Sequence, residues 1–235
     1  MDNAEKQEIL DKAKAFFKKR ILDKHIVNTK KCKDLSKFNV NPFLHKYLAQ
    51  YAFGDSSPQS MAKALIYPRI LGTSINTSFG TNMQYFCNEV LSSYASTTSG
   101  IDIEFVDCID GRKKYAQIKS GSNCINKDDI ETITGHFKSI RNLARANKLQ
   151  LNTTDCIVCV IYGEKNELNA HYKKIDKDYP VYVGQDFWFR LTGDKEFYND
   201  IINAFVEVGV DADSTALINE VIDKLAHEIE KTYNL

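Results

Sequence analysis

The first part of the chain shows the hydrophobic spacing of helices. Between residues 2 and 24, apolar side chains recur three or four positions apart, which places them on one face of a helix. Residues 25–42 are polar and rich in lysine and end at an Asn-Pro step, so they predict a connector. Further helices are expected at 43–53, 59–71 and 82–95, with a turn at 54–58 and a polar loop at 76–80 between them.

The pattern changes to that of strands after residue 100. Residues 101–109 and 113–118 are strand-like, and the Asp110-Gly111 step between them predicts a hairpin. A helix over 127–147 and an apolar strand over 156–162 come next, and this succession predicts a right-handed crossover between parallel strands. The remaining elements are expected to be a short strand at 181–183 and helices at about 185–191, 194–208 and 214–233.

Together these elements predict an α/β fold. We expect a single domain over residues 1–235, in which a central mixed β-sheet is flanked by helices. Residues 1–75 are expected to be mainly helical, and residues 76–190 are expected to form the α/β core. The sequence contains no repeat and no Pro-, Gly- or Ser-rich linker that would predict a further division.

Composition adds two expectations about partners and location. The 31 basic and 31 acidic side chains balance, but residues 1–46 carry twelve Lys or Arg against six Asp or Glu, whereas residues 151–235 carry eight against sixteen. A polyanion would therefore meet its partner surface in the first two-thirds of the chain. The N-terminus is polar and no apolar run reaches membrane-spanning length, so we expect a cytoplasmic protein that does not bind membranes.

The hairpin carries the candidate chemistry. Because side chains alternate along a strand, Asp102 and Glu104 share one face, and so do Gln117 and Lys119. A hairpin centred between Asp110 and Gly111 would place Asp102 opposite Lys119 and Glu104 opposite Gln117. Carboxylate oxygens bind Mg²⁺, the bound ion activates water towards a phosphodiester, and a neighbouring lysine stabilises the charge that develops.

Two other interpretations of these residues stay open. Asp and Lys on paired strands also form ordinary salt bridges on solvated sheets. Glu89, on the preceding helix, could complete a metal shell or could be a plain surface residue.

The spacing of these residues resembles that of the PD-(D/E)XK nucleases. The resemblance consists of Asp102, a hairpin, and then Gln117-x-Lys119, with Ile101 in place of the proline. It implies catalytic roles for Asp102, Glu104, Gln117 and Lys119 and metal ligation by Asp102, Gln117 and Glu89. Gln117 stands where the family has an acid, so Glu104 or Glu89 would have to supply the second negative charge.

A longer resemblance is to the type II restriction endonucleases that cut PuGGNCCPy and related GGNCC-type sites. It extends over roughly residues 41–210 and includes the hairpin and the segments 41–43, 67–72 and 183–188. It implies a restriction-endonuclease-like fold and a homodimer that cuts both strands of double-stranded DNA with Mg²⁺. No glycine-rich phosphate loop is present, so no nucleotide cofactor is expected.

Three groups of residues are candidates for binding DNA. A basic stripe opposite the apolar face of the 127–147 helix could contact phosphates, although a solvated helix face would show the same pattern. Small polar side chains directly after Lys119 could contact the backbone or base edges, and Arg69 could read guanine. These candidates are Lys138, Arg141 and Arg145 on the helix, Ser120, Ser122 and Asn123 after the strand, and Arg69. His136, near the stripe, is expected to be a helix-surface residue.

The sequence therefore favours a site-specific endonuclease and leaves two alternatives. One is a structure-specific or repair nuclease of the same fold. The other is a catalytically inactive DNA-binding module, which the missing acid at Gln117 makes plausible.

Overall fold

The computed structural model describes residues 2–210 and 214–233, and the chain divides into two compact units. Unit 1 comprises residues 1–16 and 80–206, and unit 2 comprises residues 17–79 and 207–235. The expected change from helical to α/β structure after residue 75 lies close to the point where the chain enters unit 1 at Gly80. The single domain over 1–235 stays a prediction.

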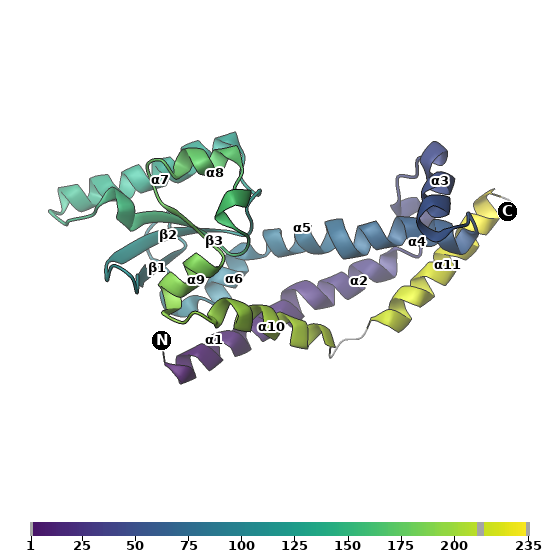
Figure 1. Cartoon of the computed structure of the whole chain (residues 1–235), viewed down its shortest axis with the longest axis horizontal. Helices are drawn as coiled ribbons and strands as arrows, with labels where there is room; N and C mark the ends of the chain where they lie inside the picture. The colour runs from purple at the N-terminus through teal and green to yellow at the C-terminus, as the bar shows by residue number, and fades with distance from the viewer. Residues whose placement is uncertain (1, 211–213, 234–235) are drawn as a thin grey trace. The chain divides into compact units, whose positions relative to one another are not determined.

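Unit 1 is built on a four-stranded mixed sheet, which confirms the predicted α/β fold (Figure 1). The strands are β1 (Ile103–Val106), β2 (Lys113–Lys119), β3 (Cys156–Val160) and β4 (Val181–Val183), in the order β1-β2-β3-β4. β1 and β2 are antiparallel, whereas β2, β3 and β4 are parallel. The parallel pair β2 and β3 is joined by α7 (Lys127–Ala146), as the strand–helix–strand pattern predicts.

Helices cover both faces of this sheet. The face that carries Gln117 and Val158 packs against α7 and α8 (Ala170–Ile175), with Phe137 and Tyr172 fully buried between the layers. The other face lies against α6 (Met83–Glu89) and α9 (Gln185–Thr192) (Figure 1). Because β3 is buried on both faces, all five of its side chains are apolar or cysteine.

The remaining elements of unit 1 lie around the α9 side. Trp188 of α9 is fully buried, and its ring lies 6.2 Å from that of Phe86. Lys6 of α1 (Asn3–Phe16) pairs with Asp194 at 2.6 Å and with Asp200 of α10 (Phe197–Val210) at 2.5 Å, so the N-terminal helix is held by the segment after α9. Short 3₁₀ turns lie at Ser92–Tyr94, Thr153–Asp155 and Lys165–Glu167.

Unit 2 is helical. Its elements are α2 (Asp23–Lys31), α3 (Pro42–Phe53), α4 (Pro58–Pro68) and α11 (Thr215–Tyr233), with π-helical turns at Phe17–Leu22 and Arg69–Thr73, a 3₁₀ turn at Leu35–Lys37, and α5 (Ser74–Thr81), which leads into unit 1. Asn41 and Ser57 cap α3 and α4, and each is followed by a proline in the first turn. The opening of a helix at Pro58 was predicted. The core lies between α4 and α11, with Ile66 and Leu225 fully buried.

Two segments of the helical part differ from the prediction. Residues 25–31 were expected to lie in a connector but belong to α2, and residues 76–80 were expected to form a loop but lie in α5. Both segments are polar, so periodicity alone gives them no helical signal. In α2 only Thr29 is buried, so this helix has no apolar stripe that would have predicted it. No helix within the described residues is long and apolar enough to cross a membrane.

Candidate active site on the antiparallel hairpin

The hairpin has a register two residues away from the predicted one. Ile103 pairs with Ala116 and Glu104 with Tyr115, so the predicted pairs were wrong. Asp102 lies just outside this pairing, and its N–H donates to the Ala116 carbonyl at 3.0 Å. The connection is longer than a two-residue turn, because the Asp107 N–H donates to the Arg112 carbonyl at 3.0 Å and closes a six-residue loop. A slip of two residues keeps every side chain on its face. Glu104, Gln117 and Lys119 therefore keep the common face that was predicted for them.

The buried carboxylate of Asp107 stabilises this turn through its hydrogen bonds. It accepts from the Ile109 N–H at 2.9 Å and from Arg190 Nη1 of α9 at 2.8 Å. Gly111 adopts a φ of 67°, which favours glycine, and its N–H donates to the Asp107 carbonyl at 2.8 Å. The ion pair to a helix far along the sequence therefore fixes the register.

Asp102 lies just before β1 and turns its carboxylate towards β2. Its Oδ2 accepts a hydrogen bond from the Ile118 N–H at 2.7 Å. Burial raises the pKa of Asp102, while the Ile118 N–H and the positive charge of Lys119 oppose this shift. Asp102 thus shares one electrostatic environment with Lys119.

Gln117 is buried, and its side-chain amide is held at two points. Nε2 lies 2.5 Å from the Gly100 carbonyl oxygen and 2.7 Å from His136 Nδ1. His136 is half-buried on α7, so the prediction of a helix-surface residue was wrong. Its position three residues after buried Ile133 and four before buried Ile140 is a sequence signal that it faces the sheet.

Lys119 ends β2 and extends towards the start of α7. Its Nζ lies 3.5 Å from Asp129 Oδ1, and both side chains are partly exposed. The other oxygen of Asp129 accepts from the Asn126 N–H at 2.8 Å within the capping box of α7. Asp129 was not predicted as part of the site, although an acid three residues after an Asn cap is a signal for this arrangement.

Glu104 is on the predicted face but has partners of its own. It accepts from Ser96 and, at 3.0 Å, from Thr98, and it pairs with Lys113 at 2.6 Å. Burial raises the pKa of Glu104, but these hydrogen bonds outweigh it and leave the pKa below its ordinary value. Glu89 is half-buried at the end of α6. Among residues 2–210 and 214–233, no three His, Cys, Asp or Glu side chains are grouped as a metal site.

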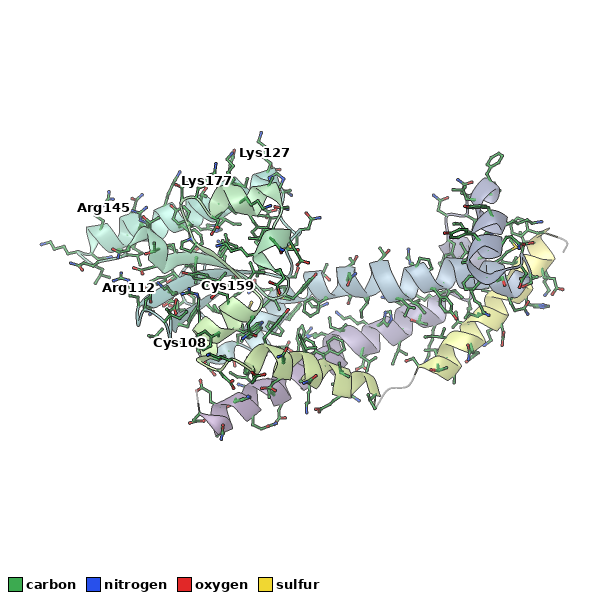
Figure 2. All side chains as sticks on the ribbon, in the orientation of Figure 1. Cys108, Arg112, Lys127, Arg145, Cys159 and Lys177 are labelled. Atoms are coloured by element: carbon green, nitrogen blue, oxygen red, sulfur yellow. The ribbon has the colours of Figure 1, made fainter. Side chains whose placement is uncertain are left out.

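The predicted DNA-binding residues differ in their surroundings. Lys138 and Arg145 are exposed on α7, and Arg145 lies at the opposite end of that helix from Lys127 (Figure 2). Arg141 is half-buried instead, and its Nε has no hydrogen-bond partner among the described residues. Burial raises the pKa of Cys156, and the positive charge of Arg141 opposes this shift. Arg141 is thus only partly on the solvated stripe.

The loop after β2 and Arg69 remain accessible. Ser120 and Ser122 are half-buried, whereas Asn123 is exposed and accepts from Asn169 Nδ2 at 3.1 Å. Arg69 is exposed in unit 2, at the edge of a 210 Å³ pocket that Lys31 and Lys37 also line.

The fold and this site define the class of protein: a mixed α/β fold of the restriction-endonuclease type, with an Asp, Gln and Lys signature on its hairpin. A sequence model of the family described as Type II restriction endonuclease EcoO109I matches residues 4–213. The chain belongs to this family of type II restriction endonucleases. The predicted resemblance is therefore confirmed. No curated protein sequence matches the chain.

Proposed function

We propose that the protein is a site-specific endonuclease that hydrolyses phosphodiester bonds of double-stranded DNA with Mg²⁺. The observation that carries this proposal is the grouping of Asp102, Gln117 and Lys119 at the end of the hairpin in a chain of this family. The alternatives are a structure-specific nuclease and an inactive DNA-binding module.

The residues present fit a magnesium ion. Mg²⁺ binds through one or two carboxylates and keeps several waters, with substrate phosphates completing its shell. Asp102 offers a carboxylate oxygen, and Gln117 offers the amide oxygen Oε1, since its nitrogen is turned to Gly100 and His136. The bound ion would polarise the phosphate and lower the pKa of a coordinated water.

The other side chains have supporting tasks. Lys119, which lies beside Asp129 and Asp102, would donate hydrogen bonds to the attacking water and to the phosphate oxygens. Glu89 and Glu104 remain proposed sources of the second negative charge. Glu104 would have to serve in this role while paired with Lys113.

A homodimer is proposed as the active form, because a two-fold symmetric protein matches a two-fold symmetric DNA site. An apolar stripe on α3 supports it, since exposed apolar patches of this size mark interaction surfaces. The stripe consists of Phe43, Leu44, Tyr47, Leu48 and Tyr51, which are between 44% and 91% exposed. Three aromatic and two leucine side chains offer roughly 500 Å², a large part of the ~800 Å² that each partner of a stable interface buries.

Digestion of supercoiled plasmid with Mg²⁺ tests the proposed function. A site-specific dimer that cuts both strands should give discrete linear fragments without a build-up of nicked circles. A smear, or cutting confined to branched junctions, would support the structure-specific alternative. Binding without any cleavage would support the inactive module.

A charge reversal on α7 tests which surface meets DNA. Lys138→Glu and Arg145→Glu should each weaken binding to a duplex that carries the mapped site. Each should also flatten the slope of log K against the logarithm of the salt concentration, by about 0.9 for each phosphate that the variant no longer neutralises. Arg141 is unsuitable, because its reversal would also place a charge in a half-buried position.

The matched control for this measurement is Lys195→Glu. Lys195 is exposed in the segment after α9, and α9 covers the sheet face opposite to α7. Its reversal should leave the salt slope unchanged. Binding should be followed by fluorescence anisotropy in a metal chelator to prevent cleavage. Equal slopes for all three variants and the wild type would show that α7 does not face DNA.

A further inference from the structure

The orientation of the Gln117 amide follows from its partners. A backbone carbonyl oxygen can only accept a hydrogen bond, so the atom that lies 2.5 Å from the Gly100 oxygen must be the amide nitrogen. The second hydrogen of that nitrogen points to His136 Nδ1 at 2.7 Å, which must therefore accept. Both amide hydrogens are used, and Oε1 is left facing away from these partners.

Oε1 has no hydrogen-bond donor among the residues that the structure describes. Both hydrogen bonds of the Gln117 side chain are made by its nitrogen, and Oε1 is not one of the fully buried atoms that lack a partner. Oε1 therefore keeps some exposure in a side chain that is 7% exposed, one residue before Ile118, whose N–H binds the Asp102 carboxylate. An accessible, fixed carbonyl oxygen beside a carboxylate is a suitable ligand for a hard cation.

We propose that His136 is a positioning residue of the metal site: with the Gly100 carbonyl, it takes both hydrogens of the Gln117 amide and so presents Oε1 to the cation. This inference rests on the proposed magnesium-dependent function. It explains how an amide can stand where the family has an acid. A carboxylate presents an oxygen in either orientation of its planar group, but an amide turned over by 180° would present hydrogens to the cation.

Gly100 belongs to the same arrangement of contacts around the Gln117 amide. It adopts a φ of 78°, and a Cβ there would collide with the His136 ring. The glycine therefore lets the imidazole approach the strand closely enough to reach Gln117. A glutamate at position 117 would place an oxygen against the Gly100 carbonyl, so Gln117→Glu is not expected to improve metal binding despite its added charge.

Binding of Mn²⁺ to the protein alone tests the proposal, because this ion shares the oxygen ligands of Mg²⁺ and its free form gives an electron paramagnetic resonance signal. His136→Ala should weaken Mn²⁺ binding by about 10-fold, as for other residues that orient metal ligands. His136→Asn should largely restore it, because the asparagine oxygen can take the place of Nδ1 as an acceptor. In a Gln117→Ala background, His136→Ala should have no further effect. The Mg²⁺ concentration for half-maximal cleavage should follow the same order.

These outcomes distinguish a failure of the positioning role from a failure of the proposed function. If the wild type binds Mn²⁺ and Asp102→Asn does not, but His136→Ala binds like the wild type, the positioning role is wrong and the metal site stands. A loss of Mn²⁺ affinity on His136→Ala that persists in the Gln117→Ala background would also overturn the positioning role, since the histidine would then act by another route. If the wild type binds no Mn²⁺ and cuts no DNA, the proposed function itself fails.

Discussion

Replacement of Asp102 by asparagine should slow DNA cleavage by at least ~10²-fold and leave DNA binding close to that of the wild type. The substitution removes a charge but keeps an oxygen that can accept from the Ile118 N–H, so the hairpin should stay folded. Lys119→Ala should have a comparable effect on the rate, because the ammonium group is proposed to stabilise charge that develops in the transition state. Single-turnover cleavage at saturating Mg²⁺ measures both rates.

The control for this prediction is Asp178→Asn, which removes one exposed carboxylate from the same unit and from outside the site. It should cut at the wild-type rate. Anisotropy in a chelator should show that Asp102→Asn still binds the duplex. If Asp102→Asn cuts at nearly the wild-type rate, the hairpin is not the active site, whatever the family membership of the chain.

Replacement of Asp155 by asparagine should destabilise unit 1 by about 3 kcal/mol, because it leaves a buried ammonium without its full partner. Asp155 and Lys114 are each 1% exposed, and their charged atoms lie 3.5 Å apart. Asp155 also accepts hydrogen bonds from Arg112 Nε at 2.7 Å and from the Asn152 N–H at 2.8 Å. Asp110 pairs with the other side of Lys114 at 2.6 Å but is partly exposed, so it compensates only in part.

Urea unfolding followed by tryptophan fluorescence measures this effect, since Trp188, the single tryptophan, lies buried in unit 1. Lys165→Gln is the matched control: it removes one charge from a pair with Asp176 whose lysine is 61% exposed, and it should cost less than ~1 kcal/mol. Equal midpoints for the two variants would show that the buried cluster adds no more than a surface pair.

The pKa of Asp155 gives the same cluster a pH dependence. Burial raises this pKa, but Arg112, the Asn152 N–H and Lys114 outweigh burial and leave it below the ordinary value of 3.8. A carboxyl whose pKa is lower in the folded state stabilises the fold above its unfolded pKa, and this contribution is lost as the pH falls through the folded value. Stability of the wild type should therefore fall below about pH 4, and Asp155→Asn should flatten this fall.

Local sequence determined the elements that carry the site. Alternation placed Asp102, Glu104, Gln117 and Lys119 on one face, and the last three keep a common face in the structure because a two-residue slip preserves parity. The 3.6-residue period gave α7, and the strand–helix–strand order gave the parallel crossover. These features depend on neighbours a few residues apart, which a sequence displays directly.

Tertiary structure decided the features that join distant segments. The register depends on the Asp107–Arg190 pair, whose members are 83 residues apart, and no turn pattern contains that information. His136 contacts Gln117 only because α7 packs on the sheet. The ion pair between Glu104 and Lys113, which gives Glu104 a partner outside the candidate site, forms only in the shifted register, where Val106 lies opposite Lys113. The sequence by itself therefore determined which chemical groups share a face, whereas packing determined which of them meet.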